Sequence, residues 1–296
     1  MSDWTAADVP DLSGKTVVVT GANSGLGFEA TRTFAEKGAH VVMACRSLDR
    51  GEDAMADIRE SVSAASLTLS ELDLADLDSV RRFADEFAAE HGSLHVLCNN
   101  AGVMAIPRRE TAQGFETQFG VNHLGHFALS ARLFPTLRDT PGETRLVTMS
   151  SGLHERGRME FDDLQGERDY DEWDAYAQSK LSNLLFAFEL DRRLTAAGID
   201  DVLSVGAHPG YAATNLQLRG PEASGSTLRY WMSKLGNAIF AQSAEMGALP
   251  LLYAATSPAV ESGEYVGPRG ETVIESGDHV VLFVEAKHAD EVSSRL

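Results

Sequence analysis

Short apolar runs alternate with segments of helical periodicity along most of the chain. Runs rich in β-branched and aliphatic residues, typical of strands buried on both faces, occur at 15–20, 40–45, 67–72, 94–98, 145–149, 202–207 and 264–266. Apolar residues at helical spacing lie between them, at 28–37, 49–60, 76–90, 116–134, 174–193 and 243–256. The pattern predicts an α/β fold, a Rossmann-type doubly wound parallel sheet of about seven strands with helices on both faces.

The same pattern continues through the 296 residues without a linker-like stretch. The length allows one large domain or two small ones, and the lack of a composition shift favours one domain over 1–296. We expect its cofactor half at about 15–150 and its catalytic and substrate-binding part at about 151–296. The segment 216–241 has few acids and an aromatic cluster, which suits a lid over an apolar substrate and equally a small packed helix.

The chain is strongly acidic, with 44 Asp and Glu against 25 Lys and Arg and a net charge of −19. This charge disfavours nucleic acid and anionic membranes as partners, because both are bound through clustered basic residues. An acidic surface poor in Lys resembles that of proteins from salt-loving organisms, where salt screens the repulsion between carboxylates. We therefore expect a halophilic protein, with an ordinary acidic protein as the alternative.

No segment of the sequence predicts export or membrane insertion. Residues 1–15 lack a basic segment followed by an apolar core. No window holds the roughly 20 consecutive apolar residues that a membrane span needs. Cys45 and Cys98 each end an apolar run, which suits buried thiols better than a disulfide. We expect a cytoplasmic protein with no membrane partner.

A glycine-rich turn joins the first predicted strand to the first predicted helix, and reads Gly-Ala-Asn-Ser-Gly-Leu-Gly at 21–27. Glycines let the backbone turn tightly and approach a pyrophosphate, and the helix N-terminus adds free N–H groups and a positive dipole end. The turn therefore predicts a dinucleotide site, with an ordinary turn as the alternative. We expect its contacts to come from Gly21, Asn23, Ser24, Gly25, Leu26 and Gly27.

The residue after the second predicted strand is Arg46. In dinucleotide folds, the residue about 20 positions beyond the glycine motif selects the cofactor, because a carboxylate holds the ribose of NAD and an Arg accepts the 2′-phosphate of NADP. Arg46 occupies this position, and the nearest acid is Asp49. The sequence therefore favours NADP(H) over NAD(H), with a solvated loop Arg as the alternative.

Polar and small residues also follow the third, fourth and sixth predicted strands. Asp73 and Leu74 follow the third, where the acid could accept the adenine amino group or cap the next helix. The segment 99–102, Asn-Asn-Ala-Gly, follows the fourth, and suits a turn lying along a flat ligand as well as an ordinary turn. Pro209 and Gly210 follow the sixth strand, with Thr214 four residues later.

Tyr176 and Lys180 are four residues apart near the start of the predicted helix at 174–193, so they lie on one helix face. A phenol has a pKa of about 10 and exchanges protons poorly at neutral pH unless a cation favours its ionised form. Such a pair also occurs by chance on helix surfaces. A second pair, His123 and His126, suggests a metal site, but no carboxylate or third ligand accompanies it. Packed histidines are the better reading, and we predict no metal.

Together these motifs resemble the short-chain dehydrogenase/reductase family across nearly the whole chain. The resemblance rests on TGANSGLG at 20–27, NNAG at 99–102, Ser-Ser at 150–151, Tyr-x-x-x-Lys at 176–180, and Pro209-Gly210 with Thr214, all in the family's order. The strings VMACRS, VNHLGHF, FDDLQ and AYAQSKLSN are similar to the retinol dehydrogenase and WW-domain oxidoreductase branch. Membrane-bound members of that branch begin with an apolar anchor, whereas residues 1–15 are polar, which argues against a retinoid substrate.

The resemblance implies a role for each motif. Tyr176 is expected to give a proton to the substrate oxygen, Ser151 to hydrogen-bond that oxygen, Lys180 to lower the tyrosine pKa and hold the nicotinamide ribose, and Asn122 to support Lys180 through a water. Ser151 is preferred to Ser150 because its separation from Tyr176 resembles that branch. The resemblance further assigns cofactor contacts to Asp73, Leu74, Asn99, Ala101, Gly102, Tyr176, Lys180, Pro209, Gly210 and Thr214.

The sequence thus predicts an NADP(H)-dependent oxidoreductase that interconverts a carbonyl and an alcohol on a lipophilic or aromatic small molecule. A hydroxyl pair backed by a cation suits the negative charge that develops on a carbonyl oxygen as it accepts hydride. The alternative is a regulator or redox sensor that binds NADP(H) without chemistry. Relatives commonly pair through the helices around Asn122 and Tyr176, which allows a homodimer or homotetramer.

Overall fold

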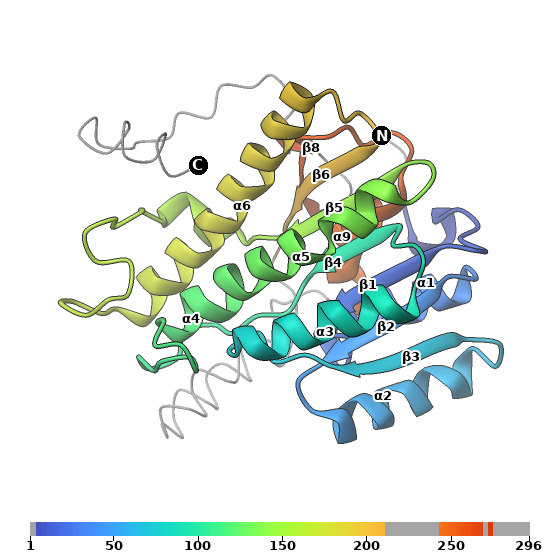
Figure 1. Cartoon of the computed structure of the whole chain (residues 1–296), viewed down its shortest axis with the longest axis horizontal. Coiled ribbons are helices and arrows are strands. Elements are labelled where there is room, and N and C mark those ends of the chain that lie inside the picture. Colours follow the sequence, from blue (N-terminus) through green and yellow to red (C-terminus); the bar gives the residue numbers. More distant parts are fainter. Residues whose placement is uncertain (1–3, 211–242, 269–271, 275–296) are drawn as a thin grey trace.

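The computed structural model describes residues 4–210, 243–268 and 272–274. Within them a single sheet runs in the order β3-β2-β1-β4-β5-β6-β7-β8 (Figure 1). All neighbours pair in parallel except β7 and β8, which are antiparallel. The strands are β1 (Thr16–Thr20), β2 (His40–Cys45), β3 (Ser66–Glu71), β4 (Val96–Asn99), β5 (Thr144–Met149), β6 (Val202–Ala207), β7 (Tyr265–Val266) and β8 (Thr272–Ile274).

Helices cover both faces of the sheet (Figure 1). One core joins the sheet to α1, α2 and α9, and a second core joins it to α3, α5 and α6. The α-helices are α1 (Gly25–Glu36), α2 (Leu48–Ser61), α3 (Leu77–Glu90), α4 (Thr117–Phe119), α5 (Gly125–Asp139), α6 (Glu172–Ala197) and α9 (Ala244–Thr256). Short 3-10 helices η1 (Ala6–Asp8) and η3 (Gly152–Arg156) and a π-helix, η2 (Gly120–Leu124), complete them. The predicted doubly wound parallel sheet is confirmed.

The central strands are apolar throughout because both of their faces are buried. In β1, Val17 and Val19 point into the core with α1 and α9, whereas Val18 points into the core with α3 and α5. All three are fully buried. Alternate residues of a strand face opposite sides, so a strand covered on both sides needs a continuous apolar run.

Local signals explain where several elements begin and end. Asp76 caps α3 by accepting from the N–H of Asp78 at 3.0 Å, and Asp171 caps α6 by accepting from two backbone N–H groups. Gly198 ends α6 in the left-handed conformation, with φ of 67°. These caps agree with the predicted helix boundaries to within a few residues.

The predicted helix at 116–134 differs from the structure. It is divided into α4, the π-helix η2 and α5, and it continues to Asp139. A π-turn inserts one extra residue into the helical repeat, which the spacing of apolar residues did not reveal. The predicted lid at 216–241 and Thr214 lie outside the described residues.

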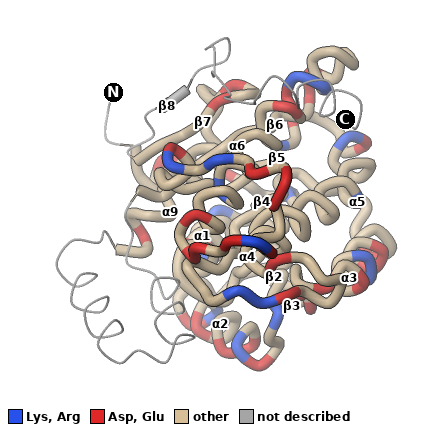
Figure 2. Tube along the Cα trace, turned by 90° about the vertical axis from the view of Figure 1, so that its left-hand side faces the viewer, with Lys and Arg blue, Asp and Glu red and all other residues tan. Residues whose placement is uncertain are grey.

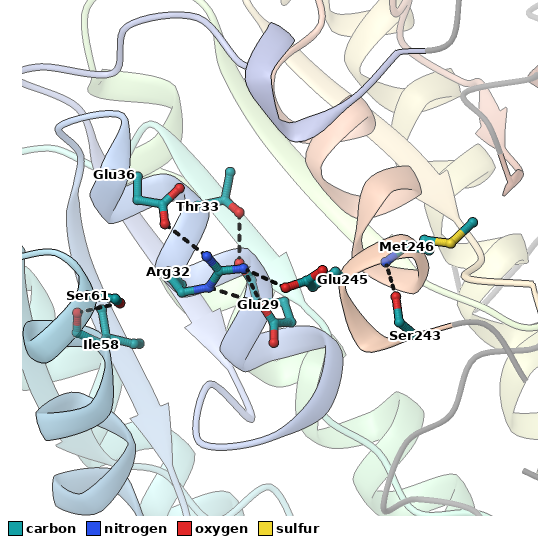
Figure 3. Close-up of polar contacts among 9 residues, drawn as sticks. All are labelled: Glu29, Arg32, Thr33, Glu36, Ile58, Ser61, Ser243, Glu245 and Met246. Carbon is teal, nitrogen blue, oxygen red and sulfur yellow. Dashed lines mark hydrogen bonds and ion pairs between the residues drawn. The ribbon is translucent and has the colours of Figure 1, made fainter. Parts of the chain in front are cut away.

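Charged residues lie mainly on the outer helices and loops, while the central strands carry almost none (Figure 2). One ionic cluster joins two helices that are far apart in the sequence. Arg32 of α1 contacts Glu29 at 2.7 Å, Glu36 at 3.0 Å and, on α9, Glu245 at 3.3 Å (Figure 3). A single cation therefore lies among three carboxylates at this helix pair. No helix among the described residues is both long and apolar enough to cross a membrane.

Candidate active site

The motifs found in the sequence meet at the carboxyl edge of the sheet. The strands β1, β4, β5 and β6 are successive neighbours, and each is followed by one of these motifs. Between β3 and β4 the chain crosses from the edge of the sheet to the other side of β1, so the strand order reverses there. Ligands of doubly wound sheets bind at such a switch point.

The glycine turn lies directly against the loop after β4. Gly21 has φ of 68°, a conformation that favours glycine. A Cβ on Gly27 would meet the Gly21 carbonyl oxygen and lie 2.6 Å from the Asn100 amide nitrogen. Helix α1 begins at Gly25, so its free N–H groups face the same turn. The turn is therefore a close-packed cradle with the geometry that a pyrophosphate needs.

A pocket runs from this turn along the ends of β2, β3 and β4. The predicted residues that line it are Gly21, Asn23, Ser24, Gly25, Leu26, Arg46, Asp73, Leu74, Ala101 and Gly102. The lining residues to which the sequence assigned no cofactor contact are Thr20, Ala44, Ser47, Arg50, Leu72, Asn100, Val103 and Val121. Because the pocket combines a glycine cradle, a helix N-terminus and basic side chains, it fits a dinucleotide.

Arg50 is the most informative of the residues that were missed. It lies in the first turn of α2, whereas Arg46 precedes Ser47, the N-cap of that helix. Two guanidinium groups and a hydroxyl thus line one end of the pocket. Because Arg46 precedes the helix, its spacing from Arg50 is no helix-face signal, and the sequence pattern offered no means of identifying Arg50.

Among the described residues, the predicted cofactor contacts that do not line this pocket are Gly27, Asn99, Tyr176, Lys180, Pro209 and Gly210. Asn99 and Asp73 need separate comment. The side chain of Asn99 does not line the pocket: it is buried, and its amide donates to Ser130 at 2.8 Å. Asn100 lines the pocket in its place. Asp73 lines the pocket and accepts from the N–H of Ala75 at 2.9 Å, while Asp76 caps α3, so the reading of Asp73 as that helix cap is wrong.

Tyr176 and Lys180 are both buried, on the face of α6 that lies against the end of β5. Burial raises the pKa of the Tyr176 phenol to about 12, and a hydrogen bond with Ser151 opposes that rise. Burial also lowers the pKa of the Lys180 amine to about 8. The pKa of Tyr176 is thus raised and not lowered as the sequence predicted, because a buried phenolate loses its hydration.

The neighbouring serines have different surroundings. Ser150 is buried and donates to the Lys180 carbonyl oxygen at 2.7 Å, which ties β5 to α6. Ser151 is the N-cap of η3 and is hydrogen-bonded to Tyr176. Its own carbonyl oxygen lies 2.7 Å from the His154 Nδ1. The structure thus brings Ser151 and Tyr176 together and directs Ser150 into the interior.

Asn122 lies in the π-helix and is completely buried. Its amide donates to the Val103 carbonyl oxygen at 2.9 Å and to the Ser179 hydroxyl at 2.9 Å, and its Oδ1 accepts from the Val103 N–H at 2.8 Å. A Cβ on Gly102 would lie between Asn122 Oδ1, at 3.1 Å, and Lys180 Nζ, at 3.7 Å. Asn122 therefore fixes the loop that separates the glycine pocket from Lys180.

The two histidines near Asn122 are packed side chains. Burial lowers the pKa of His123 to about 4 and that of His126 to about 3, so both are neutral. The described residues contain no group of three or more His, Cys, Asp or Glu that could hold a metal. Cys45 and Cys98 are buried free thiols, as predicted. Pro209 and Gly210 follow β6 at the same edge of the sheet, with Gly210 at φ of 65°.

The comparisons with known proteins agree with this geometry. The family model of the short chain dehydrogenases matches residues 15–223. Mouse retinol dehydrogenase 11 is 41% identical over 251 residues, which are 85% of this chain and 76% of the relative. Mouse polyprenol dehydrogenase is 41% identical over 274 residues, which are 91% of this chain and 80% of the relative.

Solved structures show the same fold. An uncharacterized protein from Mycobacterium paratuberculosis has a TM-score of 0.73 and 44% identity, and the match covers 90% of this chain and 85% of that chain. A protein from Beutenbergia cavernae, assigned as an NAD(P)-dependent gluconate 5-dehydrogenase and solved with NADP, has a TM-score of 0.65 and 27% identity, over 87% and 96% of the two chains. The chain therefore belongs to the short-chain dehydrogenase/reductase family of oxidoreductases, which interconvert carbonyls and alcohols with a nicotinamide cofactor.

Proposed function

We propose that the chain is an NADP(H)-dependent reductase or dehydrogenase for a lipophilic or aromatic carbonyl or alcohol. The observation that carries the proposal is the hydrogen-bonded pair of Ser151 and Tyr176, with Lys180 one helical turn from the phenol. Lys180 adjoins the pocket suited to a dinucleotide, because its Nζ lies 3.7 Å from the place of a Cβ on Gly102, which lines that pocket. A protein that only binds NADP(H) has no use for a buried phenol and a buried amine together.

The proposed roles follow from the surroundings of each group. The bound cofactor supplies or accepts the hydride. Tyr176, which is protonated at neutral pH because burial raises its pKa, gives its proton to the carbonyl oxygen. Ser151 donates to the same oxygen as negative charge develops there. Lys180 offers a cation to the phenolate that remains, and Asn122 supports Lys180 through the loop at 102–103.

The preference for NADP(H) is supported by the basic end of the pocket. Arg46 and Arg50 are exposed and line the pocket, which suits a 2′-phosphate, and the residue that follows β2 is Arg46 instead of a carboxylate that would hold the ribose hydroxyls of NAD. Relatives with bound NADP, such as the Beutenbergia cavernae protein, support the same choice. NAD(H) stays the less favoured cofactor.

The substrate class is inferred from the relatives. Retinol and polyprenol dehydrogenases are named for long apolar alcohols, and both are about 41% identical to this chain. A lipophilic substrate is therefore the better starting assumption. The cytoplasmic location, the lack of a membrane partner, the pairing into dimers or tetramers and the lid at 216–241 stay predictions from the sequence.

The experiment is a turnover assay with hexanal, benzaldehyde, all-trans-retinal and their alcohols, run with NADPH and NADH at low and high salt. We expect turnover with NADPH in the wild type. Tyr176→Phe removes only the hydroxyl, so it should abolish most turnover while NADPH still binds, as measured by its fluorescence. Turnover retained by this variant would refute the proton donor. NADPH binding without turnover of any compound by the wild type would favour the non-catalytic regulator.

A further inference from the structure

A buried histidine connects the glycine turn to Asn122. His126, on α5, is 2% exposed. Its Nε2 lies 2.9 Å from the hydroxyl of Thr20, the last residue of β1, and its Nδ1 lies 3.0 Å from the carbonyl oxygen of Asn122. One side chain therefore joins the strand before the glycine turn to the backbone of the π-helix.

The partners fix which nitrogen carries the proton. A carbonyl oxygen only accepts hydrogen bonds, so Nδ1 must donate to Asn122. His126 is neutral because burial lowers its pKa to about 3, and its Nε2 is then the acceptor. Thr20 must donate its hydroxyl proton to that nitrogen, while the same oxygen accepts from the N–H groups of Asn100 and Ala101 at 2.9 Å. The donor and the acceptor are thus determined for each hydrogen bond from Thr20 through His126 to Asn122.

Of the two hydrogen bonds of His126, the one to the Asn122 carbonyl oxygen matters more for the local structure. The π-helix that carries Asn122 is a local interruption of the helix, so its backbone depends on nearby contacts for its conformation. On the other side, the Asn122 side chain holds Val103, and Lys180 lies within the same group of contacts. Thr20, in contrast, has a second acceptor in the Cys98 carbonyl oxygen at 3.3 Å. Loss of His126 would therefore disturb Asn122 more than Thr20.

We propose that His126 is a positioning residue that holds the Asn122 backbone in place for Lys180 and Tyr176. The inference rests on the proposed function, because it matters for turnover only if Lys180 and Tyr176 act in it. His126 is not itself a proton carrier to solvent, since it and its other partner Thr20 are both buried. Its action is geometric: a shift of the Asn122 backbone by a fraction of an ångström would move the loop at 102–103, which the Asn122 side chain holds beside Lys180.

Two isosteric substitutions separate the two bonds. The amide nitrogen of Asn occupies the place of a histidine Nδ1, so His126→Asn can still donate to the Asn122 carbonyl. The amide of Gln reaches the place of Nε2, so His126→Gln can contact Thr20 but leaves that carbonyl without its donor. His91→Gln is the control, because His91 caps the far end of α3 near the start of β2. Thermal unfolding and NADPH fluorescence establish that each variant is folded and binds cofactor.

The readout is the pH profile of kcat for alcohol oxidation, with the alcohol of the panel that the wild type oxidises fastest. We expect His126→Gln to lower kcat about 10- to 100-fold and to raise the apparent pKa of the profile, because the phenolate loses support from Lys180. His126→Asn should keep most of kcat and the wild-type profile. Dissociation constants for NADPH should change less than about threefold in both.

Equal losses in the Asn and Gln variants, or a lower melting temperature with an unchanged pH profile, would overturn this role. Such results leave the proton donor untouched, which Tyr176→Phe tests separately. Nitrogen NMR of the imidazole rings provides a check that needs no substrate. It should show an Nδ1-protonated ring that does not titrate between pH 5 and 9 and is missing from His126→Gln. A ring that titrates in this range would contradict the bonding pattern.

Discussion

The Lys180 ammonium lies 5.8 Å from the centre of the Tyr176 ring and donates to the Met149 carbonyl oxygen at 3.0 Å. The same carbonyl accepts from the Asn183 amide at 3.0 Å. The amine is buried, and no carboxylate among the described residues pairs with it. A cation held mainly by one carbonyl is well placed for chemistry and costly for folding.

We predict that Lys180→Met stabilises the protein while abolishing turnover. Burial lowers the pKa of Lys180 from 10.5 to about 8, so at neutral pH the folded state binds its proton less tightly than the unfolded chain does. The resulting cost is about 1–3 kcal/mol, and it disappears as the pH rises from about 8 to above 10.5. Denaturant unfolding should show the variant more stable at pH 7, by an amount that shrinks towards pH 10.5.

Lys37→Met is the control for this prediction, because Lys37 is only partly buried and its amine donates to the Ala7 carbonyl oxygen. Its effect on unfolding should not change between pH 7 and pH 10. A Lys180→Met variant that is less stable than the wild type at pH 7 would mean that polar contacts of the ammonium outweigh its desolvation.

The two serines after β5 should separate stability from activity. Ser150→Ala removes the buried bond to the Lys180 carbonyl oxygen and should cost about 1 kcal/mol of stability. Ser151→Ala removes a donor to the substrate oxygen and should lower kcat about 10²- to 10³-fold, while loss of its long 3.3 Å cap on the short η3 should cost no more than about 0.5 kcal/mol of stability. Urea unfolding and turnover measured on the same preparations test both statements. A large loss of kcat in Ser150→Ala, with kcat retained in Ser151→Ala, would mean that Ser150 is the donor to the substrate oxygen.

Most of the fold could be predicted from the sequence because its strands are buried on both faces. The strands β2 and β6 coincide with the apolar runs at 40–45 and 202–207. The antiparallel β8 was not predicted, because three residues carry too little pattern to identify a strand. The π-helix was missed because a period of 3.6 residues is assumed when an apolar helix face is searched for.

What the sequence could not give in the site is side-chain direction. Asn99 is the last residue of β4, and its side chain points to Ser130 on α5, whereas Asn100 beyond the strand reaches the pocket. A shift of one residue in the assumed strand end reverses which Asn faces the ligand. Sequence can place a motif at the sheet edge, but the exact residue that turns outward depends on where the strand stops.

We predict that Gly27→Ala weakens NADPH binding and destabilises the fold. The added Cβ would meet the Gly21 carbonyl oxygen and lie 2.6 Å from the Asn100 amide nitrogen. Both contacts are too close for a real Cβ, so the backbone of the turn and the Asn100 side chain must move apart. Overpacking of this kind costs about 1–3 kcal/mol. Gly92→Ala is the matched control, since a Cβ there has no neighbour within 4 Å. Equal NADPH affinity in the two variants would show that the cradle is not where the pyrophosphate binds.

The basic end of the pocket should determine cofactor choice. Arg46→Ala should raise the dissociation constant for NADPH about 10- to 100-fold, the effect of one charged hydrogen bond, and leave that for NADH nearly unchanged. Arg50→Ala should act in the same direction. Arg81→Ala on α3, where the side chain pairs with Asp78, is the control. Equal losses for NADPH and NADH would indicate that neither Arg contacts a 2′-phosphate.

Finally, the acidic surface predicts that stability rises with salt. The net charge of −19 means that excess carboxylates repel one another across the folded surface. At the α1–α9 pair, for example, Arg32 alone cannot neutralise Glu29, Glu36 and Glu245. Salt weakens both the ion pairs and the repulsion, and the repulsion is the larger effect because acids outnumber bases. The melting temperature should rise by roughly 5 °C or more between 0.1 and 2 M KCl, with sucrose of equal osmolality as the control. A melting temperature that stays constant or falls would identify an ordinary acidic protein.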